Sequence, residues 1–500
     1  MIPRLLPALL SVQTVLAVNG GPSGNAPFTY TSGPLFPSPG GVSTGLSNPS
    51  YEYTGLGAAE SNIDFASDGS LIYSPAITNQ GVGYATSNDN GSTWQQVLPG
   101  GSAQPRVQPV FRKRQVNDRY FYWSSSIPGF SFSYSDDEGK TWTNLNQSHF
   151  DTMSQDWAKL VGGRPVRSQL SSSAEEILYY SAPSLISTPI PLQPLGPINQ
   201  LILKSTDGGM TWSETAGKPT LQPLLSGGAC AGLLQSLAEQ ELIIWGDGFV
   251  RPNGTVMYGL RRCQKLSVAI SDDEGDSWRL SDVPASSLAP FIVGDLTYQF
   301  DGNVLVPEPI SQDNQGTIYS IWVDPSYVLR LSRSTDNAQT WSDAIVIGAP
   351  GSGLSSNVMA YLPTLYHHPN QTGRAVLSYY GSTDNGKTYN AYIAETKNLG
   401  SAYPSWTSII MNPPSAPMQA NQDGMWDQGY GYPLGDLVEF SDVKYRSGSN
   451  DVVAAFARRM CTAPSQPRQT YPGSSCVDGW DFNAHAQSQW QGFVAFAQGT

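Results

Sequence analysis

Short runs of apolar and β-branched residues recur along the chain, and turns rich in glycine, proline, asparagine and aspartate separate them. Thr317–Trp322 and Arg374–Tyr379 are two such runs, and each follows a polar turn that contains glycine. Runs this short are typical of β-strands rather than helices. The first strands of successive sheets are expected near Ile63, Val110, Leu160, Ile244, Val304 and Tyr361. The pattern therefore predicts an all-β protein.

Composition agrees with many short strands. The 500 residues include 50 glycines and 38 prolines, only 13% are charged, and 11% are aromatic. The apolar and aromatic content is too high for a disordered chain, and the glycine and proline content is too high for a helical bundle or a coiled coil.

One eight-residue pattern, Ser-x-Asp-x-Gly-x-Thr-Trp, recurs among the predicted strands. Near-complete copies begin at Ser87, Ser135, Ser205, Ser271 and Ser334. The fifth copy has Ala338 in place of the glycine, and a sixth match, from Ser382, ends in Tyr389. The aspartate accepts hydrogen bonds from its own turn and the glycine supplies a positive φ, so each copy, called a box here, closes a hairpin.

The spacing of the boxes predicts the architecture. Their aspartates, at 89, 137, 207, 273, 336 and 384, are 48, 70, 66, 63 and 48 residues apart. Such intervals suit a four-stranded blade plus loops of variable length, which is the pattern of a single β-propeller. Seven blades are expected, with six as the alternative.

The last blade is expected to use both ends of the chain. Leu437–Val443, Asp451–Arg458 and Gly492–Ala497 supply three of its strands, and the segment around Tyr51–Leu56 supplies the fourth. This pairing closes the ring and removes exposed sheet edges.

The N-terminus has the features of a secretory signal peptide. Arg4 precedes an apolar run from Leu5 to Ala17 that ends in small residues. The run is short for a membrane span, and no later run of about 18 apolar residues follows. The sequence therefore predicts a signal peptide at 1–17, an extended segment at 18–50 and a propeller at 51–500, secreted to the extracellular space.

Cysteines and glycosylation sequons fit export. The Asn-x-Ser/Thr sequons begin at Asn90, Asn146, Asn253 and Asn370. The four cysteines allow three pairings, of which Cys230–Cys263 with Cys461–Cys476 is favoured because each pair closes a local segment. Neither a zinc-ligand spacing nor a nucleotide-binding loop occurs in the sequence, so no metal and no cofactor are predicted.

The boxes resemble those of the Asp-box (BNR) repeat proteins, a superfamily that includes the sialidases, and the resemblance extends from about residue 50 to the end. It implies that a box joins the third and fourth strands of a blade. It also implies that turns between first and second strands share this box face, and that ligands bind at the opposite rim. Four segments are expected as first-to-second turns: Asp68–Gly69, Pro252–Gly254, Asp313–Gly316 and Pro369–Gly373.

The sixth box match does not fit this scheme. It lies between Arg374–Tyr380 and Tyr389–Ala394, which are expected to be second and third strands. The match is therefore expected at the opposite rim. The box-face turn of that blade is then Lys397–Ser405, ahead of Trp406.

The chain departs from the sialidase pattern. Sialidases use an arginine triad for the substrate carboxylate, a tyrosine nucleophile assisted by a glutamate, and an aspartate as acid and base. Their first arginine usually lies in Phe/Tyr-Arg-Ile-Pro, which does not occur here. The segment Gly246–Arg261 resembles the stretch that ends in the assisting glutamate, but Arg261 occupies that position and a cation cannot act as a general base. The resemblance thus implies the scaffold rather than the mechanism.

Other residues could carry catalysis on this scaffold. Two carboxylates can hydrolyse a glycosidic bond, and the candidates are Asp64, Asp156, Glu308 and Asp436. A lyase that acts on a uronate needs a base instead, and His149 and Tyr361 are the candidates.

Arginines and aromatic residues expected at the opposite rim are the substrate-binding candidates. Arginine binds carboxylates through paired hydrogen bonds, and aromatic rings stack on sugars. These candidates are Arg106, Arg261, Arg262, Trp426, Tyr430 and Trp480.

Charge narrows the class of partner. The net charge of −13 disfavours nucleic acid and anionic membranes, because both require a basic surface. The sequence predicts a secreted, monomeric, sialidase-like carbohydrate-active enzyme, an exo-acting glycoside hydrolase on an acidic or a plant or fungal glycan. The alternatives are a non-catalytic propeller that binds a glycan or a protein, a uronate polysaccharide lyase, or an enzyme acting on a small secreted metabolite.

Overall fold

The computed structural model describes twenty-five segments of the chain. They are 29–30, 46–57, 61–66, 68–74, 84–97, 107–113, 119–125, 130–137, 140–144, 159–171, 174–184, 199–215, 245–262, 265–284, 286, 291–292, 299–300, 310–326, 328–348, 359–382, 388–402, 404–412, 418–420, 441–459 and 490–499.

In the described residues, six antiparallel sheets with four strands in a row each come from one continuous stretch of chain, and we number them blades 1 to 6. Blade 1 contains β3 (Asn62–Phe65), β4 (Leu71–Ser74), β5 (Tyr84–Ser87) and β6 (Gln95–Val97). Blade 2 contains β7 (Val107–Lys113), β8 (Tyr120–Ser125), β9 (Phe130–Ser135) and β10 (Thr143–Asn144). Blade 3 contains β11 (Lys159–Gly163), β12 (Ile177–Ser184), β13 (Asn199–Ser205) and β14 (Ser213–Glu214).

The next three blades repeat this order. Blade 4 contains β15 (Trp245–Val250), β16 (Val256–Arg262), β17 (Lys265–Ser271) and β18 (Arg279–Asp282). Blade 5 contains β21 (Ile310–Gln312), β22 (Ile318–Val323), β23 (Leu329–Ser334) and β24 (Ile345–Gly348). Blade 6 contains β25 (Met359–His367), β26 (Ala375–Ser382), β27 (Thr388–Thr396) and β28 (Thr407–Ile410), and β29 (Gln419–Ala420) also pairs with β27.

A seventh sheet, called the closing sheet here, joins both ends of the chain. It contains β30 (Asp442–Tyr445), β31 (Val452–Arg459), β32 (Trp490–Gly499) and β2 (Leu46–Gly57), with β1 (Thr29–Tyr30) beside β2. In the pairing of β2 with β32, Tyr51 lies opposite Ala495. The Tyr51 ring also stacks on Phe493 with 4.8 Å between centroids. The predicted closure by the N-terminal strand is therefore confirmed.

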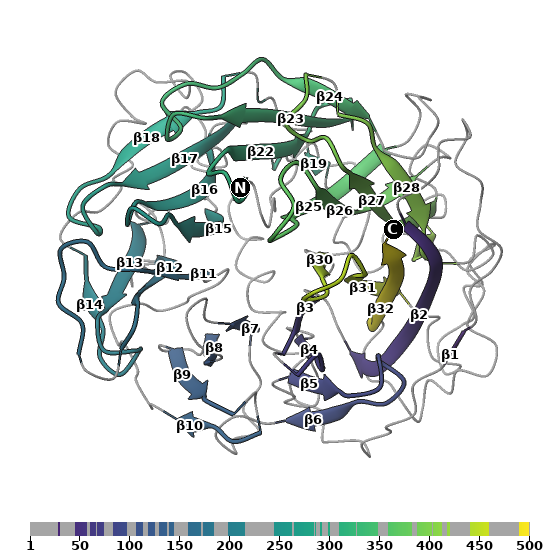
Figure 1. The fold of residues 1–500 in the computed structure, drawn as a ribbon, viewed down its shortest axis with the longest axis horizontal. Coiled ribbons are helices and arrows are strands. Elements are labelled where there is room, and N and C mark those ends of the chain that lie inside the picture. Colours follow the sequence, from purple (N-terminus) through teal and green to yellow (C-terminus); the bar gives the residue numbers. More distant parts are fainter. Residues whose placement is uncertain are drawn as a thin grey trace, which may run out of the picture.

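The sheets are arranged as a ring (Figure 1), with the first strand of each blade nearest the centre. This arrangement is a β-propeller of four-stranded blades, as predicted, and its six continuous blades match the number that was given as the alternative. A separate short hairpin pairs β19 (Phe291–Ile292) with β20 (Gln299–Phe300). No helix long and apolar enough to cross a membrane is found in the described segments.

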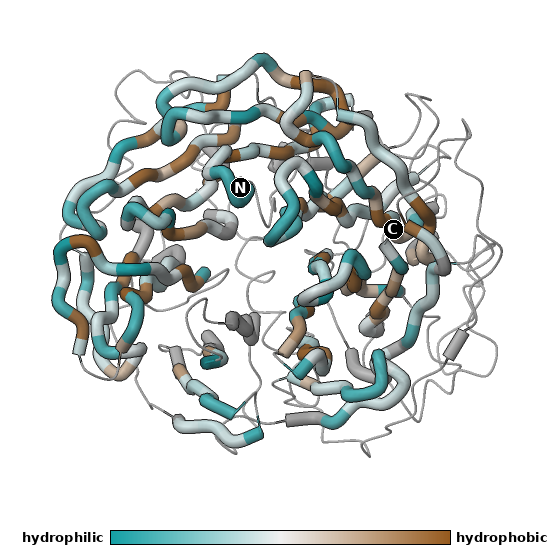
Figure 2. Tube along the Cα trace, viewed as in Figure 1, coloured by the Kyte–Doolittle hydropathy of each residue, from teal (hydrophilic) through white to brown (hydrophobic). Residues whose placement is uncertain are grey.

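The core lies between neighbouring blades. Hydrophobic residues follow the strands and hydrophilic residues are frequent in the turns (Figure 2). Box tryptophans join adjacent blades, as when Trp212 of blade 3 packs edge-on against Phe132 of blade 2, 5.1 Å between centroids. The Trp341 indole of blade 5 donates to the Ser281 hydroxyl of blade 4 at 3.1 Å. Each blade thus shields its neighbour's face from water.

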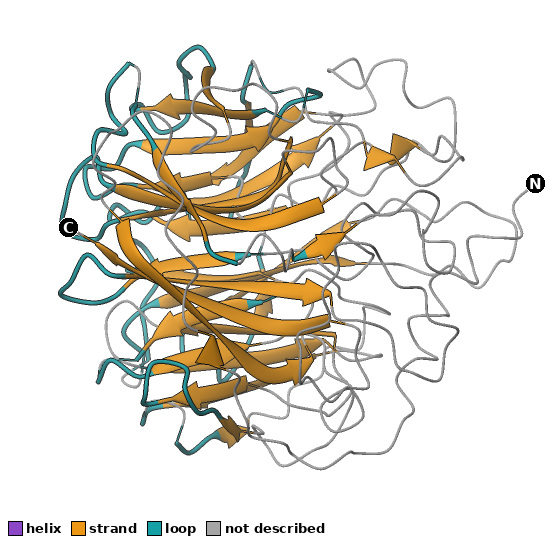
Figure 3. Cartoon of the chain, turned by 90° about the vertical axis from the view of Figure 1, so that its right-hand side faces the viewer, coloured by secondary structure: helices purple, strands orange, loops and turns teal. Residues whose placement is uncertain are grey.

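Most of the described turns lie at one end of the strands (Figure 3). All four predicted first-to-second turns are confirmed, because they join β3 to β4, β15 to β16, β21 to β22 and β25 to β26. The sixth box match does join β26 to β27, and the turn ahead of Trp406 joins β27 to β28, as predicted. Ile244 and Val304 lie outside the described residues, whereas the described first strands of blades 4 and 5 begin at Trp245 and Ile310.

Candidate functional site

Three described inner strands are irregular in their first halves, which lie toward the rim opposite the boxes. Pairing with the second strand shifts between Val107 and Val110 in β7 and between Trp245 and Gly248 in β15. It also shifts between Tyr361 and Thr364 in β25. Such bulges re-aim side chains and are over-represented next to active sites. The inner strands near this rim are therefore the candidate site.

The irregularity in β25 includes a strained residue. Leu362 has φ 51°, a left-handed conformation that costs a branched side chain energy. Leu362 is buried, and the half-buried Tyr361 ring meets Tyr389 edge-on with 5.2 Å between centroids. The surrounding packing therefore holds Tyr361, a predicted catalytic residue, on the inner strand of blade 6.

Asp64, a predicted catalytic carboxylate, lies on β3, the inner strand of blade 1. It is half-buried, and its Oδ1 accepts the Phe65 N–H at 2.7 Å. The adjacent Ile63 N–H donates to Asp442 Oδ2 at 3.0 Å, which ties blade 1 to the closing sheet. Asp64 and Tyr361 both lie on inner strands, but the closing sheet separates their blades.

Arg261 and Arg262, predicted to bind substrate, are the last residues of β16. Arg262 pairs across the hairpin with Lys265, the first residue of β17. Three cationic residues therefore occupy one hairpin tip at the opposite rim, in a chain whose net charge is −13. Their side chains lie outside the described residues, so binding of an anionic group by these arginines stays a prediction.

The other predicted site residues lie outside the described part of the chain and remain predictions. They are Asp156, Glu308, Asp436, His149, Arg106, Trp426, Tyr430, Trp480, the four cysteines and the sequon at Asn146. The sequon residues Asn90, Asn253 and Asn370 are exposed, and all three lie in box-face turns.

The box aspartates are occupied by their own turns. Asp336 Oδ1 accepts the Thr340 N–H at 2.9 Å, and Oδ2 accepts the hydroxyl of the same residue at 2.5 Å. The Thr340 hydroxyl and N–H hold the pKa of Asp336 at about 2. Equivalent bonds form at Asp89, Asp137, Asp207 and Asp273. These carboxylates are thus turn-forming groups rather than acids or bases for catalysis.

The predicted box-face turn of blade 6, ahead of Trp406, is a box that the octapeptide pattern does not match. Asn398 Oδ1 accepts the Thr396 hydroxyl at 3.0 Å and the Ser405 N–H at 2.9 Å, as the aspartate does in the other boxes. An asparagine replaces the aspartate, and Ser405 is seven residues later instead of four. A search that tolerated both changes before Trp406 would have found it.

The box position after the aspartate links neighbouring blades, which sequence reasoning also missed. Asn90, Glu274 and Asn337 occupy it with φ values of 56°, 61° and 63°. Asn90 Oδ1 accepts from Arg446, in the first turn of the closing sheet. Asn337 Oδ1 accepts from Arg251, in the first turn of blade 4, at 2.5 Å. Each of these two side chains therefore contacts the preceding sheet.

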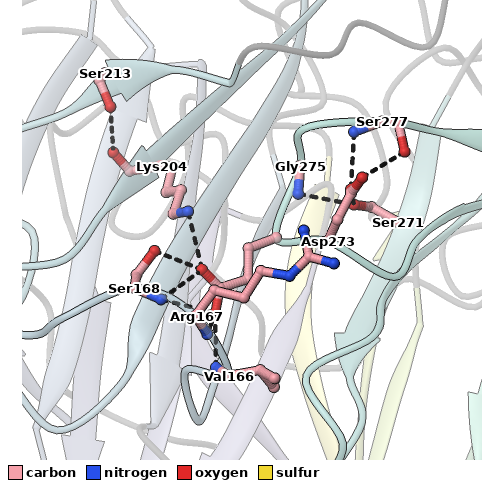
Figure 4. A network of polar contacts seen from close by, with 10 residues as sticks. Val166, Arg167, Ser168, Lys204, Ser213, Ser271, Asp273, Gly275 and Ser277 are labelled. Carbon is pink, nitrogen blue, oxygen red and sulfur yellow. Dashed lines mark hydrogen bonds and ion pairs between the residues drawn. The ribbon is translucent and has the colours of Figure 1, made fainter.

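Glu274 makes the densest of these links, and Figure 4 shows its partners Val166, Arg167, Ser168 and Lys204. Its carboxylate accepts the backbone N–H groups of Val166 and Arg167 at 2.6 and 2.7 Å, and that of Ser168 at 3.0 Å. The carboxylate also accepts hydrogen bonds from the Ser168 hydroxyl and from the Lys204 ammonium, the latter at 3.2 Å. Burial raises the pKa of Glu274, but these hydrogen bonds outweigh it and lower the pKa to about 2. Glu274 is thus a fixed anion that joins blade 4 to blade 3.

A second polar cluster contains tyrosine, glutamate and arginine but is buried at the box-face end of blade 6. Arg374 pairs with Glu395 at 2.7 Å, and their side chains are 4% and 1% exposed. The Tyr445 hydroxyl donates to Glu395 Oε1 at 3.2 Å. Burial and then the Glu395 charge raise the pKa of Tyr445, so the phenol stays protonated. This cluster connects blade 6 to the closing sheet, and the protonated Tyr445 phenol is a poor nucleophile.

No group of three or more possible metal-ligating side chains occurs within the described segments. No protein-family model matches the chain, and comparison with curated proteins finds no match.

Several solved structures match the chain at low identity. A lectin from Aleuria aurantia in complex with Fucα1-6GlcNAc is 10% identical, with 71% of this chain and 97% of the lectin covered, at a TM-score of 0.38. The NanB sialidase from Streptococcus pneumoniae is 10% identical, with 92% and 91% covered, at 0.38. A leech intramolecular trans-sialidase is 13% identical, with 88% and 68% covered, at 0.40. The assignment of a β-propeller rests on the strand pairing of the chain itself.

Proposed function

We propose that the chain is a secreted, sialidase-like carbohydrate-active enzyme that removes terminal sugars from an acidic or a plant or fungal glycan at the opposite rim. The observation that carries the proposal is the strained bulge of β25, which holds Tyr361 on an inner strand. Bulged inner strands of blades 2 and 4 accompany it. The box aspartates supply no competing site, because their own turns bind them.

The proposed roles follow from side-chain chemistry. Asp64 serves as one of two carboxylates, with Asp156, Glu308 or Asp436 as the other. Tyr361 transfers a proton or orients the sugar at the bond that breaks. Arg261 and Arg262 bind an acidic group of the substrate, as does Arg106, while Trp426, Tyr430 and Trp480 stack on sugar rings.

A panel of aryl glycosides, sialosides and uronate oligosaccharides tests the proposal. Exo-acting hydrolysis releases single sugars, whereas a lyase produces an unsaturated product that absorbs ultraviolet light. Asp64→Asn is expected to abolish release, and Tyr361→Phe is expected to reduce kcat/KM by about 100-fold or more. Arg261→Ala with Arg262→Ala is expected to raise KM for acidic substrates only. Val346→Ser, on an exposed side chain of the outer strand β24, is the matched control. The absence of product from every substrate in the panel would overturn the proposal.

A non-catalytic glycan-binding propeller is the second candidate. It is favoured by Arg261, which stands where the resemblance expects a glutamate base. Glycan-array binding that survives Asp64→Asn and Tyr361→Phe, without turnover of the bound glycans, would support it over the enzyme.

A further inference from the structure

We propose that Asn253 carries an N-linked glycan and receives it before blade 4 folds. The proposal rests on the export proposed above. Asn253 is exposed in the turn that joins β15 to β16, and it begins the sequon Asn253-Gly254-Thr255. Its Oδ1 accepts the Thr255 N–H at 3.3 Å, whereas a glycan attaches at Nδ2. The folded turn therefore accommodates the sugar.

The acceptor hydroxyl of this sequon is hidden once the blade forms. Thr255 is 2% exposed, and its Oγ1 donates to Asp272 Oδ1 at 2.7 Å. Asp272 follows β17, so this bond exists only after the β16–β17 hairpin has paired. Transfer requires an accessible threonine side chain at the third sequon position. The glycan must therefore be added while Thr255 is still unpaired.

Asn370 provides an internal comparison on the same face. Both Asn370 and its sequon threonine, Thr372, are exposed in the folded chain. The Thr372 hydroxyl donates to Asn314 Oδ1 at 2.9 Å, an exposed bond that water can replace. Asn370 is thus expected to accept a glycan before or after folding, whereas Asn253 accepts one only before.

A glycan at Asn253 would also contact a fixed apolar side chain. Val166 is 62% exposed, and a Cβ built on Gly254 would lie 2.2 Å from Val166 Cγ2. Glu274 binds the Val166 N–H, which holds this turn in place. The first sugar is therefore expected to pack on Val166 and to withdraw its apolar surface from water.

Two preparations of the full chain test the order of events. One is translated into microsomes, with its own N-terminus or with a foreign signal in place of residues 1–17. The other is folded without glycans and then offered to purified oligosaccharyltransferase. Enzymatic removal of glycans in oxygen-18 water labels each occupied asparagine for peptide mapping. Microsomes should label Asn253 and Asn370, and the prefolded chain only Asn370.

The outcomes separate the two proposals. If Asn253 is unlabelled in the chain that carries the foreign signal, the glycan proposal is overturned. If Asn253 is labelled in that chain but not in the chain with its own N-terminus, the proposal of export is overturned. If Asn253 is labelled as strongly in the prefolded chain as in the chain translated into microsomes, the proposed order of events is overturned. Asp272→Ala frees the Thr255 hydroxyl and should make prefolded Asn253 at least several-fold more reactive, whereas Asp276→Ala, in the same box, should not. Glycan removal should lower Tm less in Val166→Ser than in the original chain, and an equal drop overturns the contact with Val166.

Discussion

The two ends of the same strands are built differently. At the box face, carboxylates and amides bind their own turns or the preceding sheet, as at Asp336 and Glu274. At the opposite rim, three of the described inner strands carry bulges, and one hairpin tip contains three cationic residues. The contrast assigns fold stability to the box face and ligand chemistry to the opposite rim. Changes at the box face should alter unfolding, whereas changes at the rim should alter ligand turnover.

The largest expected effect tests the rim side of this contrast. Tyr361→Phe should reduce kcat/KM by about 100-fold or more, the usual contribution of a proton-transfer group. The denaturation midpoint should stay constant, because phenylalanine keeps the ring contact with Tyr389. Steady-state kinetics and urea unfolding measure the two quantities. Unchanged turnover would remove Tyr361 from the site.

The next effect tests the buried ion pair at the box-face end of blade 6. Glu395→Gln should lower the free energy of unfolding by about 3–5 kcal/mol, because Arg374 would stay buried without a counter-charge. Asp136→Asn is the matched control, because it breaks an ion pair to Arg119 whose aspartate is 57% exposed. That control should cost less than about 1 kcal/mol. Equal losses would contradict the role assigned to burial.

The seam between blades 5 and 6 should respond to acid. His367 accepts from or donates to the Ser311 hydroxyl at 2.9 Å, and the Tyr319 ring covers it. Burial lowers the pKa of His367 to about 4, although the charge of Asp313 opposes the shift. The folded state therefore favours neutral histidine, and its stabilisation is present above pH 6.5 and is lost as pH falls from 6.5 to 4.

The full loss is about 3 kcal/mol, because each pKa unit corresponds to about 1.4 kcal/mol. Urea unfolding at a series of pH values should show this slope in the original chain and not in His367→Asn. An identical slope in both would assign the acid response to other groups.

A smaller effect tests the link between blades 3 and 4. Glu274→Gln should cost about 2 kcal/mol, because an amide nitrogen would face backbone donors and Lys204 would lose its partner. The lowered pKa of Glu274 means that its stabilisation is present above pH 4.5 and is lost as pH falls toward 2, mostly at lower pH than the loss due to His367. If Lys204→Met lowers the free energy of unfolding but Glu274→Gln does not, the role of the backbone donors is contradicted.

The smallest effect tests the box that the pattern missed. Asn398→Asp should stabilise the fold by less than about 1 kcal/mol, because a charged acceptor strengthens the bonds from Thr396 and Ser405. Differential scanning calorimetry would detect the rise in Tm. A fall in Tm would show that the longer turn does not tolerate the charge.

The fold was predictable because a box is local. Eight consecutive residues around Asp336 contain the donors and the acceptor of their turn, so the octapeptide alone predicts the hairpin. The blade links were not predictable, because Glu274 binds a turn more than 100 residues earlier in the chain. For the candidate site, the sequence predicted individual residues but not the bulges and backbone strain of the strands that hold them. The strain at Leu362 depends on packing between strands, and Leu362 carries no local motif that signals a positive φ.

The closing sheet affects the order in which the propeller can be completed. The Ser47 hydroxyl bonds the Gln498 carbonyl, 451 residues further along the chain. A chain that emerges from its N-terminus can pair each of the six continuous blades in turn, but β2 has no partner until β32, at Trp490–Gly499, has been made. Contacts this distant slow folding. Ring closure is therefore the final step, and a chain that stops short of β32 leaves an open propeller with an exposed sheet edge.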